Sequence, residues 1–146
     1  MSTTYTFEIP LRWGDMDAYG HVNNVTIVQI LEEARVALLG CPPSSGQAGN
    51  HQPVLPLFAD LPEGTKALVA ENHIKYRSPL AYRGMPVTAK VHVSKVSPAS
   101  FTLAYELYDP LEGTHCVSAT TTLAFYSTAT GSLMRLSAEQ RQKLMA

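Results

Sequence analysis

The most informative stretch of this chain is residues 12–24, which read Arg12-Trp13-Gly14-Asp15-Met16-Asp17-Ala18-Tyr19-Gly20-His21-Val22-Asn23-Asn24. Two carboxylates, two glycines, one histidine and two asparagines fall within these thirteen residues. Polar residues at this density are poor core material, because each buried polar group needs a hydrogen-bonding partner. The composition therefore predicts a tight, irregular turn that brings backbone N–H groups and a carboxylate to one point.

The segment that follows this turn has the strongest helical pattern in the chain. Asn23 or Asn24 can cap the start of a helix, and Gly40 can end it. Apolar residues recur at steps of three and four, namely Ile27, Ile30, Leu31, Ala34 and Leu38. We therefore predict a helix over residues 24–39, whose unpaired N–H groups and positive dipole end point back into the turn.

The rest of the chain has the alternation of β-strands. The expected strands are residues 4–12, 67–76, 86–96, a strand from Phe101 to Leu107, and residues 114–127. Short turns join most of them, so consecutive strands should be antiparallel. A capping box at Ser137 predicts a short C-terminal helix. Together these elements indicate an α+β domain in which a curved, five-stranded antiparallel sheet wraps one long helix.

Composition narrows the class of protein. With 146 residues, of which 45% are apolar, the chain is expected to form a single domain over residues 1–146. A net charge of −1 favours neither a nucleic-acid surface nor a membrane anchor. No apolar run approaches the roughly 20 residues of a membrane span. Cys41 and Cys116 lack metal-ligand spacing, so we expect free thiols in a cytoplasmic protein and no metal site.

The segment from Gly14 to Asn24 resembles the motif of the hotdog-fold acyl-CoA thioesterases of the 4-hydroxybenzoyl-CoA thioesterase family. The resemblance extends to residues 32–35 and to Tyr76-Arg77-Ser78-Pro79 with Gly84, and the order of strands also agrees. It implies a hotdog fold and a hydrolase that converts an acyl-CoA into a free acid and CoA. It also implies a homodimer or homotetramer with CoA at the subunit interface. No cofactor is expected beyond the CoA of the substrate.

The resemblance also implies which residues form the site. The catalytic carboxylate of the family corresponds to Asp17, acting as nucleophile or general base. The thioester carbonyl would be held by N–H groups at the helix start, here around Val22, Asn23 and Asn24. We add six further substrate-binding candidates from the turn and from the exit of the second strand: Gly20, His21, Arg77, Ser78, Pro79 and Arg83.

The residues and the family resemblance together leave several alternatives open. Asp15 suits a structural role in the turn, while Glu32 or Glu33 on the helix is the rival catalytic carboxylate. A hydratase or dehydratase, or a non-catalytic protein that binds acyl-CoA or acyl carrier protein, remains possible on the same fold. Residues 41–66 are rich in Pro and Gly and contain an apolar stretch at 53–58. This loop is expected either to shape the acyl pocket or to cover the core or a subunit contact.

Overall fold

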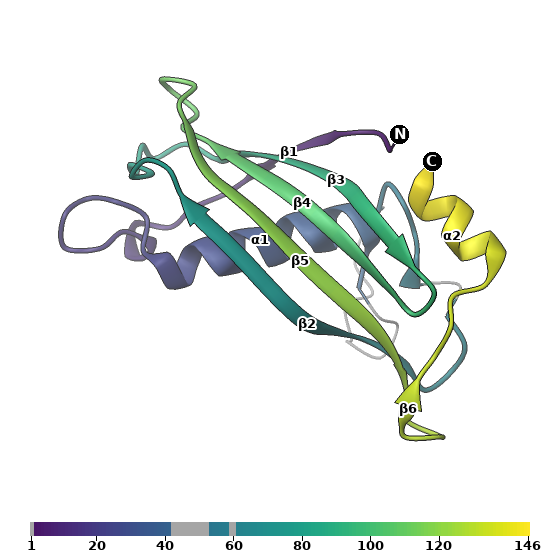
Figure 1. Cartoon of the computed structure of the whole chain (residues 1–146). Coiled ribbons are helices and arrows are strands. Elements are labelled where there is room, and N and C mark those ends of the chain that lie inside the picture. The colour runs from purple at the N-terminus through teal and green to yellow at the C-terminus, as the bar shows by residue number, and fades with distance from the viewer. Residues whose placement is uncertain (1, 42–52, 59–60) are drawn as a thin grey trace.

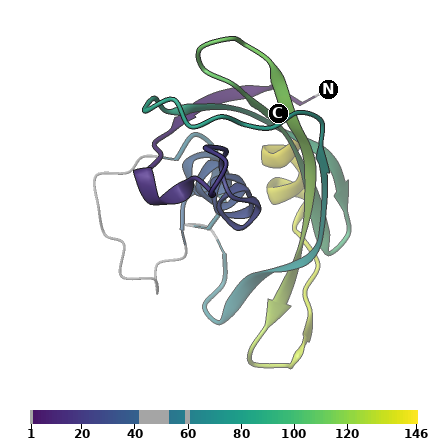
Figure 2. The ribbon, with the colours of Figure 1, turned by 90° about the vertical axis from the view of Figure 1, so that its left-hand side faces the viewer.

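The computed structural model describes residues 2–41, 53–58 and 61–146, and consists of one curved sheet with a long helix in its hollow (Figure 1). The helix α1 spans Asn24–Leu39, and a short helix α2 spans Ala138–Met145. The strands are β1 (Tyr5–Ile9), β2 (Thr65–Tyr76), β3 (Val87–Ser97), β4 (Ser100–Tyr108), β5 (His115–Ser127) and β6 (Ser132–Leu133). Viewed along α1, the sheet curves around the helix (Figure 2). The predicted α+β hotdog architecture is confirmed.

The strand order is β1-β3-β4-β5-β2, and every pairing is antiparallel. The expected short turns between neighbouring strands are found for β3–β4 and β4–β5, but not between β2 and β3. These two strands lie apart in the sheet, so residues 77–86 must pass from one side of it to the other. This connection crosses the end of α1 where the polar turn lies, and it therefore helps to build the site.

Two smaller differences have local causes. β1 ends at Ile9 rather than near Arg12, since Pro10 has no N–H to donate to a ladder and the turn begins soon after it. A sixth strand, β6, adds two residues to the sheet by pairing with the end of β5. The preceding turn includes Gly131 with a φ of 68°, a conformation that glycine adopts without steric cost.

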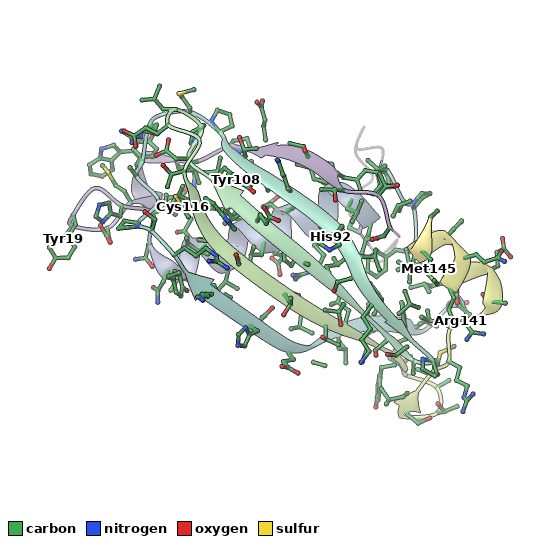
Figure 3. All side chains as sticks on the ribbon, turned by 45° about the horizontal axis from the view of Figure 1, so that its top comes forward. Tyr19, His92, Tyr108, Cys116, Arg141 and Met145 are labelled. Carbon is green, nitrogen blue, oxygen red and sulfur yellow. The ribbon has the colours of Figure 1, made fainter. Side chains whose placement is uncertain are left out.

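The core lies between α1 and the concave face of the sheet. The predicted apolar stripe of α1 is buried there, and Ala34 and Leu38 are completely inaccessible. Buried, inward-facing residues alternate along β4 and most of β5, as the period of two requires. Outward-facing side chains are more polar, and Tyr108 and His92 stand on the face turned away from α1 (Figure 3).

The described part of the long loop lies at the far end of α1. Leu57 is buried in the core, and the Leu55 N–H donates to the Leu38 carbonyl at 2.7 Å. Asn24 and Leu38 are separated by about 21 Å of helix at 1.5 Å per residue. Residues 53–58 therefore cover the core instead of lining the pocket of their own subunit at the polar turn. Residues 42–52 and 59–60 of the same prediction lie outside the described residues.

Candidate active site

The turn between β1 and α1 is built on Asp15, whose side chain is nearly buried. A 3-10 turn over Trp13–Asp15 lets the Asp15 carboxylate accept the Arg12 backbone N–H at 2.7 Å and its guanidinium at 3.3 Å. The Asp15 carbonyl accepts the Asn23 N–H at 2.8 Å. These bonds join both ends of the turn, so the geometry supports the expected structural role of Asp15.

Asp17 lies at the centre of the loop that Asp15 closes. Its Oδ1 accepts two backbone N–H groups, from Tyr19 at 2.8 Å and from His21 at 3.1 Å. Gly20 completes the tight loop with a φ of 79°, a backbone conformation that glycine adopts without steric cost. Within the described chain, no protein donor reaches the second oxygen, Oδ2. One carboxylate oxygen is thus fixed while the other is available for chemistry.

The backbone N–H groups at the helix start are not equally available. The Val22 N–H donates to the Leu80 carbonyl at 2.7 Å, and the Asn23 N–H is used by Asp15. The Asn23 side chain caps the helix by accepting the Val25 N–H at 2.8 Å. Among the described residues, the Asn24 N–H has no protein acceptor. The expected group of donors around Val22, Asn23 and Asn24 therefore narrows to Asn24.

The connection between β2 and β3 is fastened to this turn by backbone hydrogen bonds. Besides the Val22–Leu80 bond, His21 forms an antiparallel bridge with Ala81, and the Tyr82 N–H donates to the Gly20 carbonyl. At its start, the N–H groups of Arg77 and Ser78 both donate to the Cys116 carbonyl on β5. The two segments that the sequence analysis singled out are thus adjacent in space.

A pocket of about 450 Å³ lies between these segments and the first turn of α1. Most of the predicted site residues line it, namely Asp17, His21, Val22, Asn23, Asn24, Arg77, Ser78 and Pro79. Gly20 and Arg83 do not. Three lining residues were missed as site candidates: Ile27, Tyr76 and Leu80. Ile27 and Tyr76 lie on a helix and a strand, where sequence periodicity marks a residue only as part of the core, and Leu80 lies in the irregular connection 77–86, where periodicity gives no signal.

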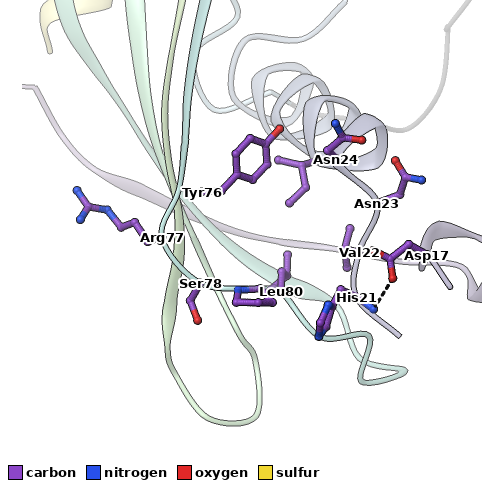
Figure 4. Close-up of a pocket in the computed structure, with 11 residues that line it drawn as sticks. Asp17, His21, Val22, Asn23, Asn24, Tyr76, Arg77, Ser78 and Leu80 are labelled. Atoms are coloured by element: carbon purple, nitrogen blue, oxygen red, sulfur yellow. Dashed lines mark hydrogen bonds between the residues drawn. The ribbon is translucent and has the colours of Figure 1, made fainter. Parts of the chain in front are cut away.

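The side chains of two neighbouring residues at the end of β2 point to opposite sides of the strand. Figure 4 shows Tyr76 turned toward Asn24 and Arg77 turned to the opposite side of the strand. The Arg77 Nε–H donates to the Ser118 hydroxyl at 2.7 Å, and the His115 ring lies 3.0 Å from that hydroxyl. Arg77 is therefore placed at the rim of the pocket, where it can meet an anionic part of a ligand but not the reacting group near Asp17.

Arg83 is held by two carboxylates outside the pocket. Its Nε and Nη2 donate to Asp109 Oδ2 at 3.1 and 3.0 Å, and Glu112 lies 3.3 Å from Nη2. Burial acts to raise the pKa of Asp109, but hydrogen bonds from the Glu112 N–H, Arg83 and the Leu111 N–H outweigh it and lower that pKa. This cluster fastens the β2–β3 connection to the turn between β4 and β5.

The lowered pKa of Asp109 predicts a pH-dependent contribution to stability. A carboxyl whose pKa is lower in the folded state stabilises fully above its unfolded pKa of about 3.9, and that contribution is lost as the pH falls through the folded pKa. We expect Asp109→Asn to be less stable than the wild type at pH 7, with the difference narrowing below about pH 4. Urea unfolding of both proteins from pH 3 to 7 measures this difference. A gap that stays constant with pH would contradict the assignment.

The alternative catalytic carboxylates, Glu32 and Glu33, face a cavity other than the pocket of Asp17. Glu32 and Glu33 line a second cavity of about 950 Å³ between α1 and the segment around β1. Glu32 lies 3.6 Å from Arg35, and neither glutamate lines the pocket of Asp17.

Over residues 2–41, 53–58 and 61–146 there is no group of His, Cys, Asp or Glu side chains arranged to hold a metal ion. No helix in the same residues is long and apolar enough to cross a membrane.

Several solved structures that resemble this chain are thioesterases by name. A predicted thioesterase from Bacillus stearothermophilus superimposes with a TM-score of 0.75 at 20% identity, covering 97% of this chain and 94% of the other. A 1,4-dihydroxy-2-naphthoyl-CoA thioesterase from Synechocystis gives 0.71 at 17% identity, with 98% and 96% covered. A Thermus thermophilus thioesterase complexed with coenzyme A and Zn gives 0.69 at 19% identity, with 97% of each chain covered. At these identities the likeness establishes the fold.

Fold and turn together define a hotdog domain of the thioesterase type. The sequence model of the thioesterase-like superfamily matches residues 11–144, and the chain belongs to that superfamily. No curated protein matches the chain in sequence. The family resemblance carried by residues 14–24 is confirmed.

Proposed function

We propose that this protein is an acyl-CoA thioesterase, with Asp17 as its catalytic carboxylate. The observation that carries the proposal is the arrangement of Asp17 in the pocket. Two backbone N–H groups fix Oδ1, Oδ2 has no protein donor in the described chain, and the start of α1 lines the same pocket. Membership of the thioesterase-like superfamily supports the choice of a thioester as the bond that is cleaved.

The proposed reaction adds water across the thioester. Asp17 Oδ2 either attacks the acyl carbon, giving an anhydride that water then hydrolyses, or removes a proton from an attacking water. In both routes the C–S bond breaks, the CoA thiolate leaves and takes up a proton, and the free acid remains. The Asn24 N–H and the positive end of the α1 dipole would stabilise negative charge on the carbonyl oxygen. This chemistry uses side chains, backbone and water alone, so we propose that no metal or separate cofactor takes part.

The remaining lining residues suit the substrate on either side of the thioester. Val22, Ile27 and Leu80 are almost fully buried and form an apolar floor for the start of the acyl group. Arg77 at the rim offers a guanidinium for the phosphates of CoA. Arg83 is less suited to that role, since its guanidinium already bonds Asp109.

Release of free thiol from a panel of acyl-CoAs tests the proposed activity. We expect saturable thiol release that persists after treatment with a metal chelator. Binding of acyl-CoA without hydrolysis would instead favour the non-catalytic alternative. Hydration of an enoyl-CoA without thiol release would favour the hydratase alternative.

We also propose that the active form is a homodimer or a homotetramer. β2 is at the end of the strand order, so one edge of this 12-residue strand is unpaired in the described structure. Leu68, Val69 and Tyr76 on this strand are about half exposed. A long, apolar edge of this kind invites pairing with another chain, and a second copy is the simplest partner.

Light scattering at micromolar concentration measures the assembly. We expect at least twice the chain mass of 15.9 kDa. Val69→Lys should shift the protein toward the monomer, because it places a charge among the exposed apolar side chains of the edge strand. A wild-type protein that is monomeric at these concentrations would contradict the proposal.

A further inference from the structure

The outward face of the sheet, which turns away from α1, carries a connected group of polar side chains next to the pocket. Arg77 lines the pocket, and its side chain points to the side of β2 opposite to Tyr76 (Figure 4). Its Nε–H donates to the Ser118 hydroxyl at 2.7 Å, and His115 Nε2 lies 3.0 Å from that hydroxyl. Arg77, Ser118 and His115, here called the Arg77 cluster, therefore extend from the rim of the pocket onto β5.

The contacts of the cluster hold the Arg77 guanidinium and leave most of its donors unused. Its Nε is bonded to Ser118, while no protein acceptor among the described residues reaches its two terminal nitrogens. The ion pairs found in the same part of the chain involve other arginines. A guanidinium fixed at Nε presents its terminal N–H groups as a planar fork, and this fork fits two oxygens of a phosphate group.

A comparison with Arg83 shows that Arg77 keeps its charge for a ligand. Both arginines belong to the connection between β2 and β3, but Arg83 is neutralised by Asp109 at 3.0 Å and by Glu112 at 3.3 Å. Within the described residues, Arg77 has a serine hydroxyl as its side-chain partner and no carboxylate. Arg83 therefore serves to fasten the connection, whereas the charge of Arg77 is available to an anion from outside the chain.

His115 controls the direction in which the Ser118 hydroxyl donates. The His115 ring stacks on Tyr108 with centroids 5.0 Å apart, and its Nε2 lies 3.0 Å from the Val117 carbonyl as well as from the Ser118 hydroxyl. Since Ser118 accepts the Arg77 N–H, an unprotonated Nε2 can take the proton of its hydroxyl. A protonated Nε2 donates to the Val117 carbonyl instead, and the Ser118 hydroxyl is then free to donate to a ligand oxygen beside the guanidinium.

The surroundings of the cluster on the outward face are positively charged. Lys75 on β2 is the direct cross-strand partner of Ser118, so both side chains lie on the same face of the sheet. The same row continues through Glu106 on β4 to Lys90 on β3. Glu106 accepts the Tyr108 hydroxyl, and Lys90 Nζ lies 4.9 Å from the centre of the Tyr108 ring. Together with the guanidinium, this row has three cations and one carboxylate, which favours an anionic ligand.

We propose that the Arg77 cluster binds a phosphate group in the nucleotide portion of an acyl-CoA, with Ser118 and His115 as substrate-binding residues and Lys75 beside them. The acyl group occupies the pocket of Asp17, and the nucleotide lies on the outward face of the sheet. This inference rests on the proposed thioesterase function and names the carrier of the acyl group, which is CoA itself and not acyl carrier protein.

Thioesters of one acyl group on three carriers test the proposal. CoA has a diphosphate and a phosphate monoester, dephospho-CoA lacks the monoester, and pantetheine has no phosphate. We expect kcat/KM for the CoA ester to exceed that for the pantetheine ester by about tenfold or more, as one hydrogen bond to a charged group allows. The dephospho-CoA ester shows which phosphate is bound: a loss with this ester assigns the monoester, and full retention assigns the diphosphate.

Variants of the cluster should lower this ratio between the CoA ester and the pantetheine ester. We expect a decrease of about tenfold for Arg77→Gln and of about threefold each for Ser118→Ala and His115→Phe, where phenylalanine keeps a ring against Tyr108. Both esters use the same folded protein and the same pocket. Damage to the fold would therefore lower both kcat/KM values and leave their ratio unchanged, so the ratio reports recognition of phosphate.

Two matched controls alter the same strands away from the cluster. Thr120→Val removes a hydroxyl from the outward face of β5, and Lys95→Gln removes a charge near the far end of β3. Both should keep the wild-type ratio. Equal kcat/KM for the CoA and pantetheine esters in the wild type, or an unchanged ratio in Arg77→Gln or Ser118→Ala, would overturn the proposal. More efficient hydrolysis of the acyl carrier protein ester than of the CoA ester would also overturn it.

Binding of the free carriers separates this proposal from the proposed activity. Calorimetry compares the dissociation constants of CoA, dephospho-CoA and pantetheine for the wild type and for Arg77→Gln. Tighter binding of CoA than of pantetheine, reduced in Arg77→Gln, would support the phosphate site even if no ester is hydrolysed. Hydrolysis of thioesters with equal binding of CoA and pantetheine would support the thioesterase and overturn the phosphate site.

Discussion

Asp17→Asn should lower turnover of an acyl-CoA by at least 10²-fold, the low end of what a positioned acid–base group contributes. The asparagine Oδ1 can still accept the N–H groups of Tyr19 and His21, so the loop should keep its shape. Only the charge on the free oxygen is lost. Single-turnover thiol release measures the effect on the chemical step, and binding of a non-hydrolysable acyl-CoA analogue should hardly change.

Glu32→Gln and Glu33→Gln are the controls for this experiment. Both glutamates line the second cavity, so both variants should hydrolyse the ester at close to the wild-type rate. Near wild-type turnover in Asp17→Asn, with loss in either glutamine variant, would move the catalytic carboxylate to α1. Near wild-type turnover in all three would leave the proposed mechanism without its carboxylate.

Asp15→Ala should destabilise the protein by about 1–3 kcal/mol. The reason is that the Arg12 N–H loses the carboxylate that accepts it, and the Asp15 side chain is nearly buried. For a chain of this size, each kcal/mol lowers the melting temperature by roughly 2–4 °C. Activity should fall with the folded fraction, since Asp15 positions the turn and takes no part in the chemistry.

Thermal melts distinguish the roles of the two aspartates. Asp17→Asn should melt close to the wild type, while Asp15→Ala should melt several degrees lower. The melting temperature of Asp15→Asn should lie between them, because its amide oxygen still accepts the Arg12 N–H. A variant at Asp15 that melts like the wild type but has lost its activity would contradict the structural role and place Asp15 in the chemistry.

Local sequence signals determined the elements and the turn. The helix over 24–39 could be read because its apolar period, its Asn23 cap and Gly40 are all close in sequence. Inward and outward faces of the strands follow from alternation in the same way. The placing of Asp17 in a tight loop before the helix also depended on neighbours within a few residues.

Only the tertiary structure decided which of these groups remain available for chemistry. The Val22 N–H is taken by Leu80, and the Arg83 guanidinium by Asp109, partners that lie far away in the chain. Periodicity fixes the face on which a side chain lies but not which strand lies beside it, so the passage of residues 77–86 across the sheet could not be read from pattern. Hydrogen-bond partners at such separations depend on the strand order. Only the assembled sheet therefore shows that Asp17 Oδ2 and the Asn24 N–H have no protein partner among the described residues.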